Sequence, residues 1–423
     1  MQILDANGDG RADLMVSDGT ISGYFPLDGQ RGWDVPSFQR YTVAPSFNLK
    51  DPEVHLIDLD GDGVTDAIRS STRFEYFIQS ETGWTQTGVA ERTAVESFPN
   101  ITFSDPRVKW GDMSGDGLQD PVLVEKGSVT YWPNLGRGKW GRRVHMANSP
   151  RLPYEHNPKR ILVGDVDGDG LADLVYVDDT SVTLWINNSG NSWSGPIVVH
   201  GTPSVSDLDS LRLVDLMGTG IAGILWSADA TLTSLPRMFF LDFAGGQKPY
   251  LLDRLDNHIG GQTKVTYWPS TQCFLTDQVR PETRWKTSLP FLVQVVASVN
   301  VSDAFSGGTL TTEYGYHHGY WDGLEREFRG FGRVNHRDTE VFEATQTPSG
   351  TSVQPVPPIE TITWFHLGPI DDGPGKWHEE DFSSEFFRHD PPMLPKSTEL
   401  KSVLDTLQSN HRRDAIRTLR GSV

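Results

Sequence analysis

A nine-residue acidic loop recurs along this chain at a nearly constant interval. In its fullest copy, residues 165–173, the sequence DVDGDGLAD places aspartates at positions 1, 3, 5 and 9 and glycines at positions 4 and 6. Glycine tolerates the positive φ that a tightly curled loop requires. The first aspartates of five copies lie 53, 54, 53 and 50 residues apart. A fixed period of this size indicates repeated supersecondary units that stack on their neighbours.

The side chains of these loops predict a metal site. Calcium takes roughly six to eight oxygen ligands, and carboxylates are its usual source in proteins. The alternative is that the Asp/Gly loops are turns without a metal. The fifth copy, residues 215–223, keeps the glycines but has lost three acids. The predicted calcium ligands are Asp5, Asn7, Asp9 and Asp13; Asp58, Asp60, Asp62 and Asp66; Asp112, Ser114, Asp116 and Asp120; and Asp165, Asp167, Asp169 and Asp173.

Two other calcium-binding repeats are excluded by spacing. An EF-hand needs a bidentate glutamate at position 12, where the four acid-rich copies have Val16, Arg69, Leu123 and Tyr176. The metal-binding β-helix repeats every nine residues, far below the observed period.

Short runs of β-branched and aromatic residues between turn residues follow each loop, such as residues 129–132 and 182–186. Such runs are typical of strands. About four strands per repeat is the content of one propeller blade. These loops and strands resemble the FG-GAP/VCBS blades of integrin-type β-propellers, and that resemblance also implies calcium binding. We therefore expect an all-β fold that begins with a calcium-binding β-propeller.

Composition agrees with a turn-rich β protein, since apolar residues are 36% of the chain and it contains 42 Gly, 27 Pro and 13 Trp. The net charge of −19 argues against nucleic acid or anionic membrane partners. Fourteen of the acids lie in the four acid-rich loops. The single Cys273 excludes an internal disulfide. No apolar run approaches the roughly 20 residues of a membrane span.

The N-terminus runs straight from Met1 into an acidic loop, without a signal peptide and without the strand expected before Asp5. We interpret the chain as a fragment of a longer protein. Its expected location is secreted or extracellular, with a cytoplasmic stage before release.

From Lys248 the sequence changes character. Residues 248–271 predict a hairpin with its turn at Gly260 and Gly261, and residues 290–303 and 309–316 predict a second one. The segment YHHGYWDGLEREFRGFGRV follows at residues 316–334. This set resembles the middle region of the B component of Tc-type insecticidal toxin complexes (TcdB-like). It is also similar to the related region of the Salmonella plasmid virulence protein SpvB. The resemblance covers about residues 248–342.

That resemblance implies a role in toxin assembly. In the family the propeller docks onto a pore-forming A component, and B with an Rhs-type C component builds a shell of Rhs/YD repeats around a cytotoxic polypeptide. This chain departs from the pattern, because it has no run of YD repeats and no effector domain. Encapsulation and translocation by this chain alone are therefore in doubt.

No residue set predicts catalysis. Adjacent histidines on a strand, here His317 and His318, point to opposite faces and do not easily share a ligand sphere; we interpret them as part of a loop packed by aromatic rings. The charges at residues 325–329 are expected to form cross-strand ion pairs. No HExxH, GxSxG, P-loop or CxxC pattern occurs. We expect no enzyme.

The C-terminal part reads as a linker with a strand at residues 360–366, then an amphipathic helix. In this helix Leu400, Val403, Leu404 and Leu407 fall on one stripe, and Ser397 or Thr398 is the N-cap. The stripe either packs on the body or docks further sequence. The predicted segments are blades at 1–246, a β-rich middle domain at 247–345, a linker and strand at 346–395 and a helical tail at 396–423. The predicted function is a toxin-assembly module; the alternative is a calcium-dependent adhesin or lectin-like surface module.

Overall fold

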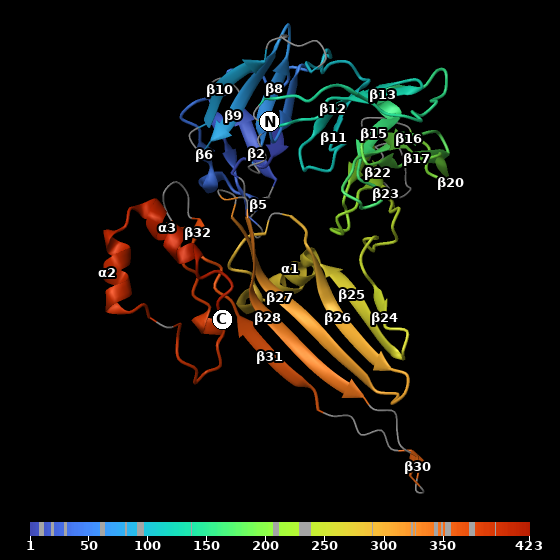
Figure 1. Ribbon diagram of the computed structural model, residues 1–423. Coiled ribbons are helices and arrows are strands. Elements are labelled where there is room, and N and C mark those ends of the chain that lie inside the picture. Colours follow the sequence, from blue (N-terminus) through green and yellow to red (C-terminus); the bar gives the residue numbers. More distant parts are fainter. Residues whose placement is uncertain are drawn as a thin grey trace. The chain divides into compact units, whose positions relative to one another are not determined.

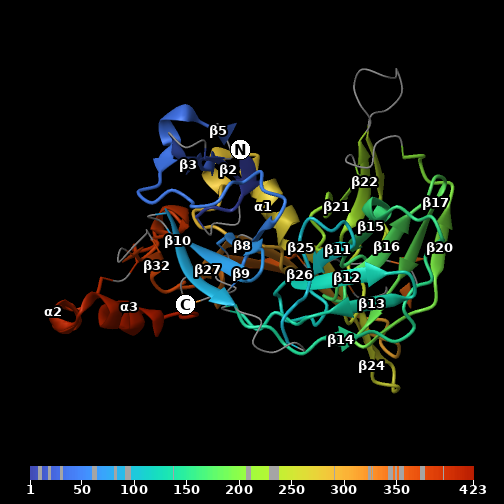
Figure 2. The same cartoon turned by 90° about the horizontal axis from the view of Figure 1, so that it is seen from above.

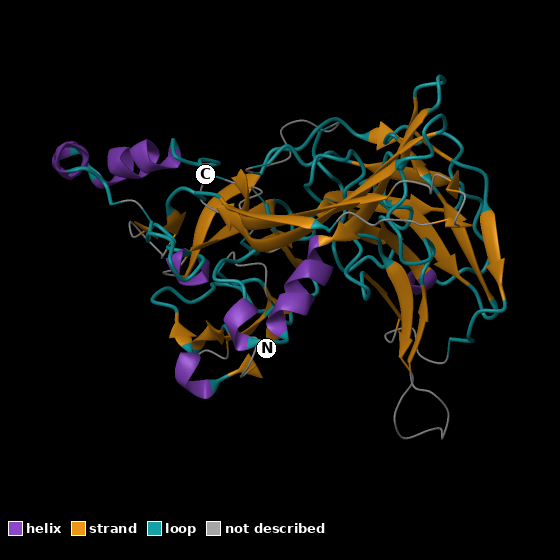
Figure 3. Ribbon diagram, turned by 90° about the horizontal axis from the view of Figure 1, so that it is seen from below, coloured by secondary structure: helices purple, strands orange, loops and turns teal. Residues whose placement is uncertain are grey.

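Most of the regular secondary structure in the computed structural model is antiparallel sheet, and helices are confined to a few segments (Figure 3). The chain divides into two units, Met1–Tyr250 and Leu251–Val423, coloured along the sequence in Figure 1. The structure describes all residues except 8–11, 18–20, 29–31, 60–63, 81–82, 91–96, 137, 206–210, 228–237, 290, 323–324, 326, 342–345, 348–349, 352–356, 372–376 and 394.

The first unit contains one sheet for each acidic loop, and strands adjacent in sequence pair in every sheet. The first sheet has β1 (Gln2–Leu4), β2 (Asp13–Ser17), β3 (Ser22–Phe25) and β6 (Gln39–Arg40), and the second has β7 (Val54–Ile57), β8 (Asp66–Ser70), β9 (Phe74–Ser80) and β10 (Gly83–Ala90). The third has β11 (Val108–Gly111), β12 (Asp120–Glu125), β13 (Ser128–Tyr131) and β14 (Val144–His145). The fourth has β15 (Ile161–Gly164), β16 (Asp173–Val177), β17 (Ser181–Trp185) and β20 (Ile197–His200). The fifth has β21 (Leu211–Val214), β22 (Gly223–Ser227) and β23 (Met238–Leu241).

Smaller elements lie between these strands. They are the ribbon of β4 (Leu27–Asp28) and β5 (Gly32–Trp33), the ribbon of β18 (Asn187–Asn188) and β19 (Ser192–Trp193), and the 3₁₀ turns η1 (Val35–Ser37) and η2 (Pro158–Arg160).

Every acidic loop connects the first two strands of its sheet, as the repeat predicts. The expected four strands per repeat are confirmed in four of the five sheets. Figure 2 shows β11 to β13 and β15 to β17 as neighbouring sheets. The arrangement of the sheets as a propeller remains a prediction.

Consecutive sheets share apolar cores, which is the packing expected of stacked repeats. Large side chains from both members of a pair meet in each core, because one face of a four-stranded sheet must be covered by its neighbour. The shared cores contain Met15 with Phe77 and Trp84, Phe74 with Trp140, Val122 with Leu174 and Trp193, and Val175 with Ile224 and Trp226.

The second unit is built on one six-stranded antiparallel sheet in the order β24-β25-β26-β27-β28-β31 (Figure 1). Its strands are β24 (Arg254–Asp256), β25 (Gly261–Pro269), β26 (Gln294–Asp303), β27 (Thr309–Asp322), β28 (Glu327–Val341) and β31 (Ile359–Trp364). The remaining elements are α1 (Ser270–Gln278), η4 (Pro281–Thr283), β29 (Gln346–Thr347), β30 (Gly350–Thr351), β32 (Ile370–Asp371), β33 (Trp377–His378), η5 (Ser383–Glu385), α2 (Thr398–Thr406) and α3 (Ser409–Arg417).

Both hairpins expected after Lys248 are present, as β24 with β25 and β26 with β27. The strand expected at residues 360–366 is β31. Helix α1 was not predicted. The histidine segment was wrongly interpreted as a loop, since it lies inside β27, although His318 itself has a φ of 58°.

The helical tail forms two short helices, and the Ser397 side chain caps α2 by accepting a hydrogen bond from the Leu400 amide at 3.2 Å. The apolar stripe is only partly covered. Leu404 is 7% exposed, whereas Leu400 and Val403 are 43% and 57% exposed. No helix in the described part of the chain is long and apolar enough to cross a membrane.

Candidate metal centre

The loop at residues 165–173 is held in its curl by its first aspartate. The two carboxylate oxygens of Asp165 accept hydrogen bonds from the amides of Gly168 at 2.6 Å and Gly170 at 3.0 Å. Both glycines have positive φ, 82° and 93°, which other residues rarely adopt. The glycine spacing therefore turns successive amides toward one carboxylate.

Three carboxylates converge in this loop. Asp165, Asp167 and Asp173 each contribute one oxygen to a group whose members all lie within 4.8 Å of one another, the only such metal-type group among the described residues. The side chain of Asp169 instead accepts a hydrogen bond from the Leu171 amide at 2.8 Å. A set of hard oxygen donors in one small volume fits a calcium ion.

Burial raises the pKa of Asp173 to about 7, and the charges of Asp167 and Asp165 act in the same direction. Burial also raises the pKa of Asp165. Burial is the main cause of both shifts, and the clustered negative charge, which a divalent cation would offset, adds to them.

The loop at residues 112–120 has the same backbone geometry but a looser set of acids. Asp112 accepts hydrogen bonds from the amides of Gly115 and Gly117, both at 2.7 Å. Its acids do not form a group within the same distance of one another. Ser114, at the position of Asp167, is exposed. Burial raises the pKa of Asp120 to about 7.

The first two loops are described only in part. Asp9, Asp60 and Asp62 lie outside the described residues. Of the predicted ligands that are described there, the Asp5 carboxylate accepts a hydrogen bond from the Asn7 amide at 3.3 Å. Asp58 is half-buried at the start of the second loop.

The fifth loop shows that the curl does not depend on the acids at positions 3, 5 and 9. Asp215 accepts hydrogen bonds from the amides of Thr219 at 2.9 Å and Gly220 at 2.7 Å. Gly218 and Gly220 again have positive φ, 64° and 83°. The acids at positions 3 and 5 of the other loops are therefore not needed to form the turn, which is compatible with a role as metal ligands.

The aspartate at position 9 has a structural role that sequence reasoning missed. In each acid-rich copy it is at most 1% exposed. One of its oxygens accepts a hydrogen bond from the amide at loop position 2. The other accepts a hydrogen bond from an amide in the third strand of the sheet or in the connection that follows that strand. The pairs of amides are Ala6 and Leu27 for Asp13, Leu59 and Gln79 for Asp66, Met113 and Asn134 for Asp120, and Val166 and Asn187 for Asp173.

Neighbouring loops are joined through their backbones. The amide at position 8 donates to the carbonyl of the first aspartate of the preceding loop, as Thr65 does to Asp5 at 3.1 Å. The same bond joins Ala172 to Asp112 at 2.6 Å and Ala222 to Asp165 at 3.0 Å. These bonds connect the first loop with the second, the third with the fourth, and the fourth with the fifth.

The histidines of the second unit bind different carboxylates. His317 Nδ1 lies 2.6 Å from Asp277 of α1, and His318 Nε2 lies 2.8 Å from Glu385 of η5. The expectation that they do not share one ligand sphere is consistent with these separate partners. Burial alone would raise the pKa of Glu385, but His318 and Arg333 lower it to about 2.

The charged segment after β27 pairs mainly with α3 rather than across the sheet. Arg413 contacts both Asp322, at 2.7 Å, and Glu325, at 2.9 Å, and Arg417 contacts Glu327 at 2.9 Å. Among the described residues of this segment, the predicted cross-strand pairing occurs for Arg329 alone, which lies 2.5 Å from Asp322, while Arg326 lies outside the described part of the chain. Residues about ninety positions apart meet here, so no local pattern could reveal the pairing.

These features define an all-β protein of repeated acidic-loop sheets followed by a six-stranded sheet domain. Two family models match it: the FG-GAP-like repeat at residues 112–176 and the insecticide toxin TcdB middle/N-terminal region at residues 187–358. The second match begins well before Lys248, where the sequence resemblance was placed. The resemblance to FG-GAP repeats and to the Tc toxin B component is confirmed.

Solved structures agree with this assignment. A chain in the structure of the Photorhabdus luminescens Tc holotoxin pore is 25% identical, with a TM-score of 0.77 over 99% of this chain and 19% of that one. A chain of the TcdB2-TccC3-Cdc42 crystal structure is 22% identical, with a TM-score of 0.66 over 100% of this chain and 22% of that one. This chain therefore spans about a fifth of the length of these Tc toxin chains. No curated protein matches the chain significantly.

Proposed function

We propose that this chain is a non-catalytic assembly module of a secreted Tc-like toxin B component. Its repeat unit would form a β-propeller that docks onto a pore-forming partner. The observation that carries the proposal is the match over 99% of the chain to part of the Tc holotoxin pore structure at 25% identity. The second unit would connect the propeller to the shell-forming part of the toxin and its Rhs-type C component.

The propeller arrangement is supported by the repeated connectivity of the first unit. Antiparallel sheets of one strand order follow one another, adjacent sheets share cores, and hydrogen bonds link successive loops. A short radial repeat of this kind leaves few exposed strand edges.

Calcium would stabilise this unit rather than take part in a reaction. Asp165, Asp167 and Asp173 would hold the ion in the best-formed loop, and the equivalent acids would hold it in the other three. When bound, the ion supplies positive charge to clustered carboxylates. Asp173 at the same time fastens the loop to the sheet through its two amide donors.

Binding to a Tc-type A component tests the docking proposal. The purified chain is passed over immobilised A component, with millimolar calcium and with excess chelator, and circular dichroism confirms folding in both conditions. We expect saturable binding that is stronger with calcium. A folded chain that binds in neither condition would contradict docking but leave the calcium proposal intact.

Calcium content is measured separately by equilibrium dialysis with calcium-45. Asp167→Ala should lower the number of bound ions by about one, since one carboxylate of one loop is removed. The matched control is Thr219→Ala in the fifth loop, which lacks the acids and should leave the number unchanged. A glycan array tests the adhesin alternative, which expects sugar binding that the chelator abolishes.

A further inference from the structure

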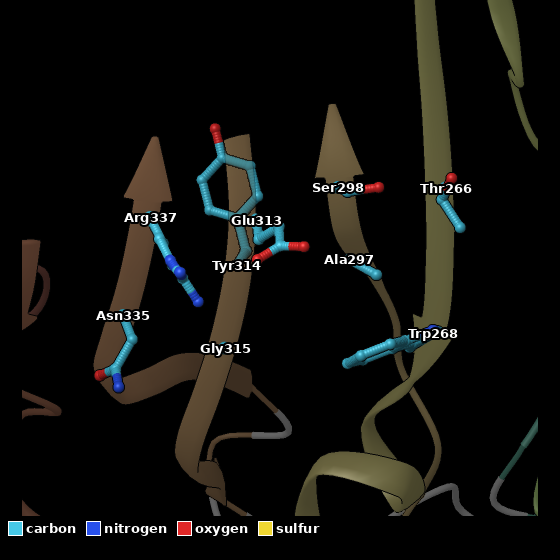
Figure 4. Close-up of a pocket in the computed structure, with 9 residues that line it drawn as sticks. All are labelled: Thr266, Trp268, Ala297, Ser298, Glu313, Tyr314, Gly315, Asn335 and Arg337. Carbon is cyan, nitrogen blue, oxygen red and sulfur yellow. The ribbon is translucent and has the colours of Figure 1, made fainter. Parts of the chain in front are cut away.

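A groove on the six-stranded sheet of the second unit has the features of a small-molecule site. It encloses about 330 Å³, within the range of ligand pockets. Figure 4 shows side chains from β25, β26, β27 and β28 around it.

Small residues leave room at the centre of this groove. Gly315 on β27 is the register partner of Asn335 on β28, and a Cβ placed on Gly315 would come no closer than 3.5 Å to its neighbours. On β26 the pairing with β25 shifts between Thr266 and the next residue, leaving Ala297 as the extra residue of a bulge. Because a bulge disturbs the alternation of side chains, Ala297 and its neighbour Ser298 both line the groove.

One wall is an aromatic surface. Trp268 is 44% exposed, and Figure 4 shows its ring extending from β25 across the floor toward β27. Large aromatic side chains are normally buried because they remove much apolar area from water. An exposed indole beside polar groups offers an apolar face on which the C–H face of a pyranose ring can stack.

The other wall supplies hydrogen-bonding groups that are not used within the protein. Glu313 and Arg337 are register partners on β27 and β28, and both point toward the centre of the groove (Figure 4). Neither side chain forms an ion pair or a hydrogen bond with another described residue. Asn335 adds an amide, and Thr266 and Ser298 add hydroxyls, so donors and acceptors are both available.

The balance of charge favours a neutral ligand. Glu313 and Arg337 are the only charged side chains in the lining, and their charges cancel. A peptide strand is disfavoured, because β25 to β28 are interior strands whose backbone groups already pair with their neighbours. The occupant must therefore be recognised by side chains. A ring with one apolar face and several hydroxyls meets these requirements.

We propose that this groove binds a neutral saccharide, stacked on Trp268 and hydrogen-bonded by Glu313, Arg337 and Asn335. The site is distinct from the acidic loops, and the proposal does not depend on calcium or on the docking of the first unit. A sugar site here would give a toxin-like module a contact with glycosylated surfaces.

The test uses saturation-transfer NMR on the full chain. The probes are glucose, galactose, mannose, N-acetylglucosamine, lactose and cellobiose, each at millimolar concentration, with sialyllactose and a sulfated disaccharide as anionic probes. We expect transfer to at least one neutral sugar. Transfer to none of the neutral probes, or to the anionic probes alone, overturns the proposal.

Two variants locate the site. Trp268→Ala removes the stacking surface, and Gly315→Ala places a methyl group in the groove without a backbone clash. Each should weaken binding of the neutral sugar by about tenfold or more. The matched controls are Trp33→Ala, at a tryptophan that is 42% exposed in the first unit, and Gly195→Ala, where a Cβ would meet nothing within 4 Å. Both controls should bind as the original chain does.

Circular dichroism confirms that each variant is folded before it is compared. Binding that persists in both folded groove variants would overturn the assignment to this groove. Excess chelator separates the two kinds of sugar site, because the groove should bind equally well without calcium. Sugar binding that disappears with chelator belongs to the acidic loops and also overturns the proposal.

Discussion

The two units handle buried negative charge in different ways. In the first unit the carboxylates of Asp165, Asp167 and Asp173 lie beside one another and accept hydrogen bonds chiefly from backbone amides. In the second unit the buried Asp322 contacts two guanidinium groups, those of Arg329 and Arg413. The acidic loop of residues 165–173 gathers like charges, whereas the Asp322 cluster pairs opposite ones.

This difference indicates where each unit obtains its stability. Backbone amides satisfy the hydrogen-bonding capacity of a carboxylate but only partly offset repulsion between two of them. Under the calcium proposal the acidic loops would take their cation from solution, whereas the arginine-rich α3 is part of the same chain as the acids it contacts. We expect the stability of the first unit to depend on added metal and the stability of the second unit to depend on its own arginines.

Removing calcium should give the largest effect. Four loaded loops contribute about 2.7 kcal/mol each when free calcium is a hundredfold above the dissociation constant, so chelation should lower the melting temperature of the first unit by well over 10 °C. Differential scanning calorimetry of the full chain, with hydrogen exchange to locate the change, measures it. Equal decreases in the melting temperatures of both units would contradict the proposed contrast between them. No decrease would indicate that the acidic loops are turns without a metal.

Breaking the buried pair of the second unit comes next. Arg329→Met leaves Asp322 with Arg413 as its remaining cation, and the loss of one partner from a buried pair costs about 3–5 kcal/mol. Urea unfolding of the full chain measures the change, and hydrogen exchange should place it in the second unit. The matched control is Arg107→Met, because the Arg107 side chain is 46% exposed and exposed pairs contribute about 0–1 kcal/mol.

The sequence was sufficient to predict the structural elements that follow from a repeated or an alternating pattern of residues. The period of the loops and their glycines predicted both the sheets of the first unit and the position of each loop between two strands. Alternating residues predicted the hairpins of the second unit, and Ser397 was one of the two residues predicted as the helix cap. Each of these depends on residues close together along the chain.

What the sequence did not reveal depends on distant contacts. Helix α1 carries no amphipathic stripe, and its N-cap position is Pro269 without a capping side chain, so neither usual signal was present. The attachment of α3 to the end of β27 and β28 joins Arg413 to Asp322 across 91 positions. The second role of Asp173 follows from an amide of Asn187, fourteen residues away. Only the folded chain brings these groups together.

Two substitutions in one loop separate metal binding from backbone support. Asp167→Ala removes a predicted ligand whose carboxylate accepts hydrogen bonds from the Asp169 amide and the Tyr250 hydroxyl at the surface. It should reduce the calcium-induced rise in melting temperature and change stability in chelator by about 0.5 kcal/mol or less. Asp173→Ala leaves the buried amides of Val166 and Asn187 unpaired, and should cost about 1–3 kcal/mol even in chelator. Equal behaviour of the two variants would contradict separate roles.

The smallest expected effect is a change of stability with pH. It tests whether side chains of the second unit itself stabilise a buried carboxylate there. The pKa of Glu385 is lowered from 4.5 to about 2 in the folded chain, because His318 and Arg333 outweigh the opposing effect of burial. Its contribution to stability is therefore complete above pH 4.5 and is lost as the pH falls toward 2. About 1 kcal/mol of this stability should be lost between pH 6 and pH 4.

In Glu385→Gln this part of the pH dependence should vanish. Glu125→Gln, at a residue whose side chain is 46% exposed, is the control and should retain it. Hydrogen exchange of β28 and η5 at pH 6, 5 and 4 measures the change. If Glu385→Gln and the original chain show the same pH dependence, the Glu385 carboxylate is not stabilised by His318 and Arg333.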